Sequence, residues 1–150
     1  MKKIAAIAAV AAFLVGLATA NAQITGPTAL RGVYDQLRKQ TTYLVELQGE
    51  QVVIRNRDNG KELATLRQVS PQCLTVVGEV GDSQDATSAA QTLAWMSHMN
   101  CSSRVGTWSL DNGSGKITMH HNLNPRLLSA PVMANTALLC CDLLRRTQRA

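Results

Sequence analysis

Aromatic side chains are scarce in this sequence, and their scarcity limits both the core and the ligands. They make up 3% of the chain, and apart from Phe13 they are Tyr34, Tyr43, Trp95 and Trp108. A core must therefore be built mainly from Leu, Val, Ile, Met and Ala. The arginines are scattered and have no aromatic stacking platform beside them, which argues against a nucleic-acid ligand. We expect no nucleic-acid partner.

The sequence also lacks the spacings that mark common catalytic and metal sites. It has no Gly-x-Ser-x-Gly turn and no evident Ser–Lys pairing, which argues against the usual serine nucleophiles. His120 and His121 are neighbours on an expected strand, so their side chains point to opposite faces and cannot share one metal ion. His98 is expected on the exposed side of a helix. We therefore expect no enzyme activity, no metal site and no other cofactor.

No hydrophobic run in the chain reaches the length that spans a bilayer. The longest, residues 4–18, is rich in Ala and follows Lys2 and Lys3, whereas a transmembrane helix needs about 20 apolar residues. Two lysines without arginine do not make a twin-arginine signal. A positive start followed by a short apolar run is typical of a cleavable export signal, and it favours that reading over an uncleaved anchor.

A cleavage site follows the apolar run. Ala20 and Ala22 occupy the third and first positions before Gln23, where signal peptidase accepts only small side chains. We predict a signal peptide of residues 1–22 and one mature domain of residues 23–150, periplasmic or secreted and without a membrane span. Removal of 22 of the 150 residues leaves 128, enough for one core, and lowers the formal charge from +5 to +3 because two lysines are lost.

The mature domain would hold four cysteines, an even number that indicates disulfides in an oxidising compartment, with three possible pairings. An expected strand at residues 73–80 would span about 26 Å, and an expected helix at residues 86–100 about 22 Å. If the helix runs back along the strand, its end returns near the strand's start. This geometry predicts a disulfide between Cys73 and Cys101.

The other two cysteines, Cys140 and Cys141, are adjacent in an expected helix. Their Cβ vectors would point about 100° apart, and a disulfide between them would be strained. We expect one to face the core and the other to be free or to pair with a second chain. A thioredoxin-like redox pair would need two cysteines separated by two residues at a helix start, whereas this pair lies late in its helix.

Hydrophobic periodicity and turn signals predict an α+β fold. Asp58-Asn59-Gly60 and residues 111–115 are rich in residue types that accept positive φ, and they predict two tight hairpins. Hairpins without alternating strand–helix units predict an antiparallel meander with helices at its start, middle and end, in the order α-β-β-β-β-α-β-β-α. The expected helices are residues 28–39, 86–100 and 129–146, and the expected strands are residues 43–48, 51–57, 62–69 and 73–80 and the two halves of a hairpin within 108–123.

The same periodicity assigns buried faces to the second and third helices. The second helix would begin at a cap supplied by Asp82 or Ser83 and would bury Leu93 and Met96. The last helix would present a wide apolar stripe. Its members would be Val132, Met133, Leu138, Leu139, Leu143 and Leu144.

Several stretches in the second half of the chain follow the order and periodicity of a known family. They are Leu93-Ala94-Trp95-Met96, Arg104-Val105-Gly106-Thr107-Trp108, Ser109-Leu110-Asp111-Asn112-Gly113, Ile117-Thr118-Met119 and the closing stretch from Asn124 to Leu144. In these stretches the chain resembles the YbjN-like domains, which share an architecture with type III secretion chaperones. The resemblance extends over residues 28–146. Export, mild basic charge and cysteines set this chain apart from the family's familiar members, which are cytoplasmic and acidic.

The resemblance implies a non-enzymatic role in binding or holding other proteins. We expect a chaperone-like module whose partner is another protein or a second copy of itself, because a chain poor in aromatics and ending in an apolar helix leaves apolar surface uncovered. A binder of small ligands or of the cell-envelope surface is the alternative. A thiol-active envelope protein using Cys140 or Cys141 is a third possibility.

Overall fold

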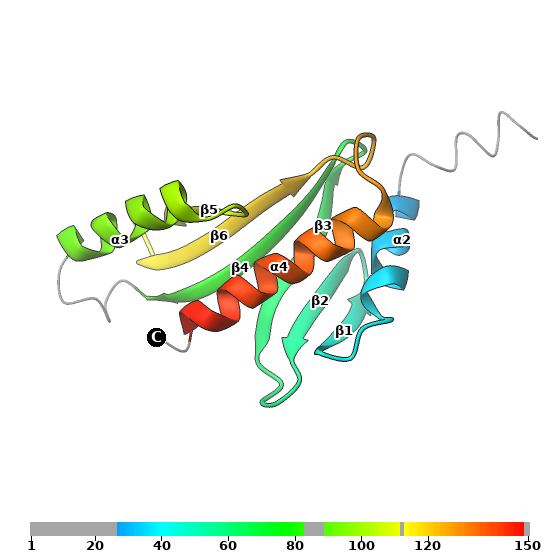
Figure 1. Ribbon diagram of the computed structural model, residues 1–150, viewed down its shortest axis with the longest axis horizontal. Coiled ribbons are helices and arrows are strands. Elements are labelled where there is room, and N and C mark those ends of the chain that lie inside the picture. Colours follow the sequence, from blue (N-terminus) through cyan, green and yellow to red (C-terminus); the bar gives the residue numbers. More distant parts are fainter. Residues whose placement is uncertain (1–26, 83–88, 112, 149–150) are drawn as a thin grey trace, which may run out of the picture.

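The computed structural model describes residues 27–82, 89–111 and 113–148 of the 150-residue chain. In this part of the chain the predicted α+β order of helices and strands is confirmed (Figure 1). The elements are α2 (Pro27–Leu37), β1 (Tyr43–Gln48), β2 (Gln51–Asn56), β3 (Glu62–Ser70), β4 (Cys73–Asp82), α3 (Ala89–Ser102), β5 (Thr107–Leu110), β6 (Lys116–Leu123) and α4 (Ala130–Gln148).

The six strands form one antiparallel sheet in the order β1-β2-β3-β4-β6-β5. The first four are joined by tight turns, and Gly49 and Gly60 supply the positive φ that the β1–β2 and β2–β3 turns require. After β4 the chain passes through α3, and β6 rather than β5 then pairs with β4. The edges of the sheet are therefore β1 and β5.

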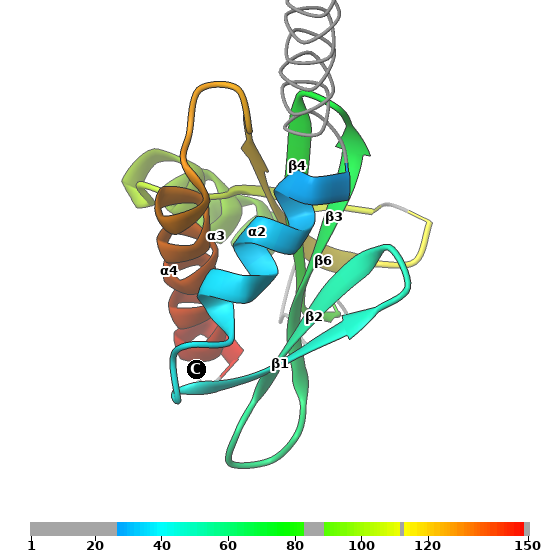
Figure 2. The ribbon, with the colours of Figure 1, turned by 90° about the vertical axis from the view of Figure 1, so that its right-hand side faces the viewer.

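The helices cover one face of the sheet (Figure 2). Along β6, Ile117, Met119 and Leu123 enter the core, as the period of two requires. Residues between them on the opposite face are polar: the Thr118 hydroxyl bonds Ser109 on β5 at 3.0 Å. The sheet is thus half-buried.

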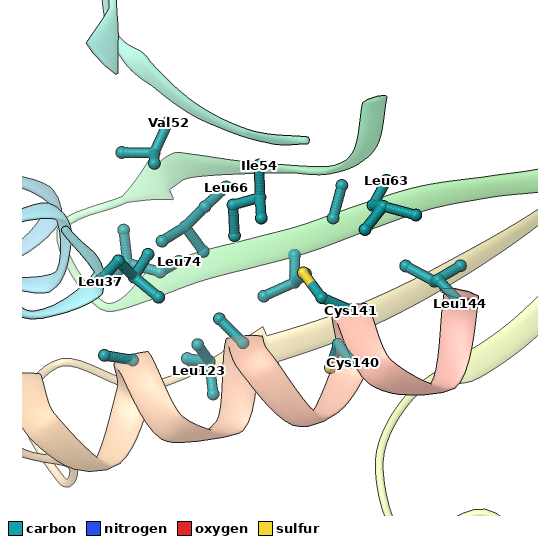
Figure 3. Packing of buried hydrophobic residues seen from close by; sticks show 14 of the residues in the cluster. Leu37, Val52, Ile54, Leu63, Leu66, Leu74, Leu123, Cys140, Cys141 and Leu144 are labelled. Atoms are coloured by element: carbon teal, nitrogen blue, oxygen red, sulfur yellow. The ribbon is translucent and has the colours of Figure 1, made fainter. Parts of the chain in front are cut away.

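α4 lies across the middle of the covered face and meets β3, β4, β6 and α2 (Figure 3). Leu144 is fully buried near its end and packs directly over Gly78 of β4. A Cβ at position 78 would overlap Leu144 Cδ1 and would come within 2.8 Å of the backbone oxygen of Leu63. Glycine at this position therefore permits the close approach of helix and sheet.

The buried face of α4 agrees with the predicted one in part. Its buried side chains are Met133, Ala134, Ala137, Cys140, Cys141 and Leu144. Of the predicted stripe, Met133 and Leu144 are buried and Leu138 and Leu143 pack against the core, but Val132 and Leu139 are exposed by 47% and 56%. Between Met133 and Leu144 the contact is made by small Ala and Cys side chains, which let the helix lie close to the sheet.

α3 is attached to the sheet through β5, at the end farthest along the strand order. Trp95 packs edge-on against Trp108, with ring centroids 5.2 Å apart. The predicted burial of Met96 is confirmed, whereas that of Leu93 is wrong, because the Leu93 side chain is 57% exposed and Thr92 is buried instead. Asp82 is the last residue of β4, and the alternative cap, Ser83, lies outside the described residues, so the predicted cap stays a prediction.

Candidate functional site

A groove lies at the end of the sheet where the β1–β2 and β3–β4 turns meet α2. It has a volume of about 440 Å³. One wall is α2, the other two are the turns, and the lining is mainly apolar. The lining residues are Leu30, Arg31, Leu47, Gly49, Glu50, Gln68, Val69, Ser70 and Pro71.

Two apolar side chains of this groove face solvent. Val69 is 69% exposed and Leu47 is 37% exposed, whereas Leu30 in the α2 wall is buried. Alternation along β3 places Val69 on the face opposite Leu66 and Gln68, away from the core. The register of β3 against β4 also shifts between Gln68 and Ser70, so Val69 has no Cα partner in β4.

Gln68 gives the groove an unpaired acceptor. Its amide nitrogen donates to the Ser70 backbone oxygen at 3.3 Å, but its side-chain oxygen is buried and accepts no hydrogen bond. A buried carbonyl without a partner costs about 1–3 kcal/mol. A donor brought by a partner, such as a backbone N–H, would recover part of that cost.

The charges at the rim of the groove are not equivalent. Arg31 is paired with Asp35 one helical turn away, at 3.6 Å. Glu50 forms no ion pair with any described residue. The groove therefore combines exposed apolar side chains, one unpaired acceptor and one unneutralised acid, which suits an extended peptide carrying apolar and basic residues.

The four cysteines are free thiols in the structure. Cys73 is half-buried at the start of β4, and Cys101 is exposed near the end of α3. The return of that helix along β4, from which the Cys73–Cys101 disulfide was predicted, is not observed, because α3 packs on β5 instead. The pairing has no support from this arrangement and stays a prediction.

The adjacent pair in α4 departs from the prediction that one cysteine faces the core and the other is free. Cys140 and Cys141 are both fully buried, because α4 is covered by the sheet on one side and by neighbouring core residues on the next (Figure 3). Burial raises the pKa of the Cys140 thiol to about 12, and it raises the pKa of Cys141 as well, with help from the neighbouring Cys140 and Asp142. Neither thiol forms the reactive thiolate at neutral pH, and this argues against the thiol-active alternative.

The histidines lie as the sequence predicted. His98 and His120 are exposed, while His121 is half-buried on the opposite face of β6. His121 Nδ1 accepts a hydrogen bond from the Gly106 backbone N–H at 3.0 Å, and burial lowers its pKa. Among the described residues no three metal-ligating side chains come together. No described helix has the length and apolar character needed to cross a membrane.

The predicted signal and its cleavage site, Ala20, Ala22 and Gln23, lie outside the described residues. The residues that form the groove were not singled out from the sequence. Val69 and Gln68 fell in a predicted strand, and nothing in the local sequence reveals that the register against β4 shifts at these residues. Ser70-Pro71 was the available signal, because it marks a turn at which a strand edge is disrupted.

The fold is similar to that of a chain in a solved chaperone–effector complex. A chain of the HopA1–SchA chaperone–effector complex matches with a TM-score of 0.57 and 14% identity, over 82% of this chain and 93% of that one. A chain of the ExoT–SpcS complex from Pseudomonas aeruginosa (TM-score 0.46, 14% identity, 80% and 93% covered) and YbjN, a putative transcription regulator from E. coli (TM-score 0.48, 16% identity, 83% and 86% covered), are also similar.

The first of these matches shows the fold, and at its level of identity it shows only the fold. The chain has the secretion-chaperone-like architecture that its resemblance to YbjN-like domains implied. No protein-family model matches the sequence, and no curated protein matches it.

Proposed function

We propose that this chain is an exported, non-enzymatic, chaperone-like module that holds an extended segment of another protein in the groove beside α2. The observation that carries the proposal is the exposure of Val69 and Leu47 at the rim of a groove of about 440 Å³. Fully burying a side chain of this kind contributes about 1.5–3 kcal/mol. A partner that covers both would gain a useful part of that energy.

The polar groups of the groove define the bound segment further. Gln68 offers a side-chain oxygen that accepts nothing within the described chain, and an extended peptide presents backbone N–H groups at every second residue on one side. Glu50, without an ion-pair partner, favours a basic residue next to the apolar ones. The segment would thus be extended, apolar and flanked by Lys or Arg.

A pair of variants tests the site. Val69→Asp places a charge in the groove, while Leu93→Asp places the same charge at a similarly exposed apolar position on α3. Each purified protein is titrated with a reduced and alkylated model protein that cannot refold, and binding is followed by fluorescence anisotropy. We expect Val69→Asp to weaken binding roughly tenfold or more, the equivalent of about 1.4 kcal/mol, and Leu93→Asp to bind like the parent.

If the two substitutions weaken binding equally, or if the parent does not bind the model protein, the groove is not the binding site. Self-association through the same apolar rim is tested by sedimentation at several concentrations. If the parent forms a dimer that Val69→Asp abolishes, the occupant is a second copy of this chain.

Export is the part of the proposal that depends on sequence alone. Its support is the order of Lys2 and Lys3, a short apolar run, and Ala20 and Ala22 before Gln23. Intact-mass measurement of the protein from its own cells tests it. A product that begins at Gln23 supports export, and a cellular product that retains Met1 contradicts it.

A small-molecule ligand is the second candidate, because the groove's volume falls within the range of about 300–1,000 Å³ that small-molecule sites occupy. Thermal denaturation against lipids and glycans distinguishes this role, since a ligand that binds only the folded state raises the melting temperature. A rise that Val69→Asp abolishes, without binding of the unfolded model protein, would favour the small-ligand role.

A further inference from the structure

A second, smaller cavity lies at the opposite end of the sheet from the groove. The β2–β3 hairpin and the C-terminal end of α4 enclose a volume of about 150 Å³. Because β2 and β3 are antiparallel to their neighbours, the β2–β3 turn is at the other end of the strands from the β1–β2 and β3–β4 turns. The lining is polar: Asn56, Asp58, Asn59, Lys61, Arg145 and Gln148.

The two asparagines of the hairpin present donors to the cavity. Asn56 Oδ1 accepts from the Asp58 backbone N–H at 2.9 Å, and Asn59 Oδ1 accepts from the Lys61 N–H at 2.9 Å. With both carbonyl oxygens occupied inside the turn, the two NH₂ groups remain, and neither donates to another described residue. The hairpin's own hydrogen bonds thus orient the amides with the donor side available.

Both cations that line the cavity are incompletely paired. Lys61 forms no ion pair with any described carboxylate, the nearby Asp58 included. Arg145 reaches Asp142 through Nη2 at 3.4 Å, but Asp142 also accepts the Tyr43 hydroxyl, and Arg145 Nε is buried without a partner. The guanidinium is held over the Tyr43 ring, 5.6 Å from its centroid, so its position is fixed.

We propose that this cavity binds a small oxyanion, a carboxylate or a phosphate group. Amide, ammonium and guanidinium donors converge from two elements, and charge-assisted hydrogen bonds to such oxyanions are the strongest that these side chains form. The cavity is smaller than the range typical of drug-sized ligands, and it suits one such group. Asp58 is the single acid in the lining, and its carboxylate opposes the anion. The inference does not depend on the proposed protein-binding role.

The test is a titration of the ¹⁵N-labelled protein with sodium phosphate and, separately, with sodium acetate, while sodium chloride keeps the ionic strength constant. We expect saturable shifts of the backbone amides of the β2–β3 hairpin, and the comparison of the two salts identifies the preferred oxyanion. Lys61→Met removes an exposed side chain without a structural partner and is expected to weaken binding roughly tenfold. Arg126→Met, which makes the same change of charge at an exposed position outside the cavity, is expected to bind like the parent.

Asp58→Asn sharpens the test, because it removes the opposing charge while keeping the size of the side chain. We expect it to tighten binding of whichever anion the parent prefers. The proposal is overturned if neither anion shifts the hairpin amides saturably, or if Lys61→Met binds as Arg126→Met does. Weaker anion binding by Asp58→Asn would also overturn it, because the carboxylate would then be part of the site.

Discussion

α3 and α4 lie on the same face of one sheet, yet they are held to it in different ways. α4 meets β3, β4, β6 and α2 and buries six side chains, whereas α3 packs on β5 and, among its described side chains, buries Thr92 and Met96. Because stability scales with the apolar area removed from water, the α4 side carries most of the free energy of folding. Elements with few buried contacts are the ones that open first.

The two ends of the molecule therefore suit different tasks. The groove beside α2 lies on the side held by α4, so we expect its backbone walls to be preformed. The Gln68 side chain, whose oxygen is buried, must turn to meet a partner's donor. The α3 end is expected to undergo local opening without loss of the sheet.

The largest loss of stability is expected from truncating a fully buried side chain of α4. Leu144→Ala removes a fully buried side chain and leaves a cavity, so we expect the free energy of unfolding to fall by about 2–5 kcal/mol. Leu93→Ala, on the exposed side of α3, is expected to change it by less than about 0.5 kcal/mol. Urea denaturation of both variants measures the two values, and similar losses would contradict the division.

Gly78→Ala tests the close approach of α4 to the sheet. The new methyl would overlap Leu144 and press on the Leu63 backbone oxygen, 2.8 Å away, so we expect destabilisation by about 1–3 kcal/mol. Gly32→Ala is the matched control, because its methyl would meet Ala130 Cβ at an ordinary 3.5 Å. In a helix that change is expected to stabilise by up to about 1 kcal/mol. Denaturant midpoints compare the two, and a neutral Gly78→Ala would show that α4 packs more loosely.

Asn100 tests the attachment of α3. Its side chain pairs with both backbone groups of Trp108, accepting from the N–H at 2.7 Å and donating to the carbonyl at 3.2 Å, as a neighbouring strand would do along the edge of β5. Asn100→Ala leaves both groups unpaired, and we expect a loss of about 1 kcal/mol. Hydrogen exchange at the Trp108 amide is expected to quicken roughly tenfold while the α4 amides stay protected.

Ser97→Ala, on the exposed side of the same helix, is the control for that experiment. If exchange quickens equally throughout α4 in Asn100→Ala, the two helices unfold as one unit and the contrast between them is lost.

The smallest effect is a pH dependence at the link between α3 and β5. Burial lowers the pKa of His121 below its ordinary value of about 6.5, so the unfolded state binds the proton more readily than the folded state does. The stabilising contribution of neutral His121 is complete above pH 6.5 and is lost as the pH falls through 6.5 toward the lower folded-state pKa. Protonation of Nδ1 also removes the acceptor for the Gly106 N–H.

His121→Asn keeps an acceptor near that position but does not titrate. We expect urea denaturation between pH 7.5 and 5 to show that the free energy of unfolding of the parent falls, relative to that of the variant, as the pH falls. If the difference in the free energy of unfolding does not change with pH, His121 does not contribute to the pH dependence of stability.

The strands and hairpins were predictable because alternation and Asn-Gly turns act locally. β2 and β3 were found from Val52, Ile54 and the turn at Gly60 without any knowledge of the rest of the chain. The pairing of β6 with β4 could not be predicted, because the chain passes through α3 between the two strands and the strand order depends on packing. The local sequences of β5 and β6 do not indicate which of the two strands pairs with β4.

The predicted buried faces of α3 and α4 were partly wrong, and for a common reason. Periodicity gives large apolar residues the greatest weight, but a helix that lies close to a sheet uses small ones, as Ala134, Ala137 and Cys141 do here. Leu139 and Leu93 satisfied the pattern and are exposed. The groove was missed because it depends on the bulge at Gln68 and on three segments that meet only in the folded chain.

Hydrogen exchange with and without an unfolded model protein tests the central claim most directly, because it reports on both ends of the molecule at once. We expect added protection in residues 47–50 and 68–71, which line the groove, and none in α3. Protection confined to residues 93–101, or no change anywhere in the described chain, would contradict a preformed binding groove beside α2.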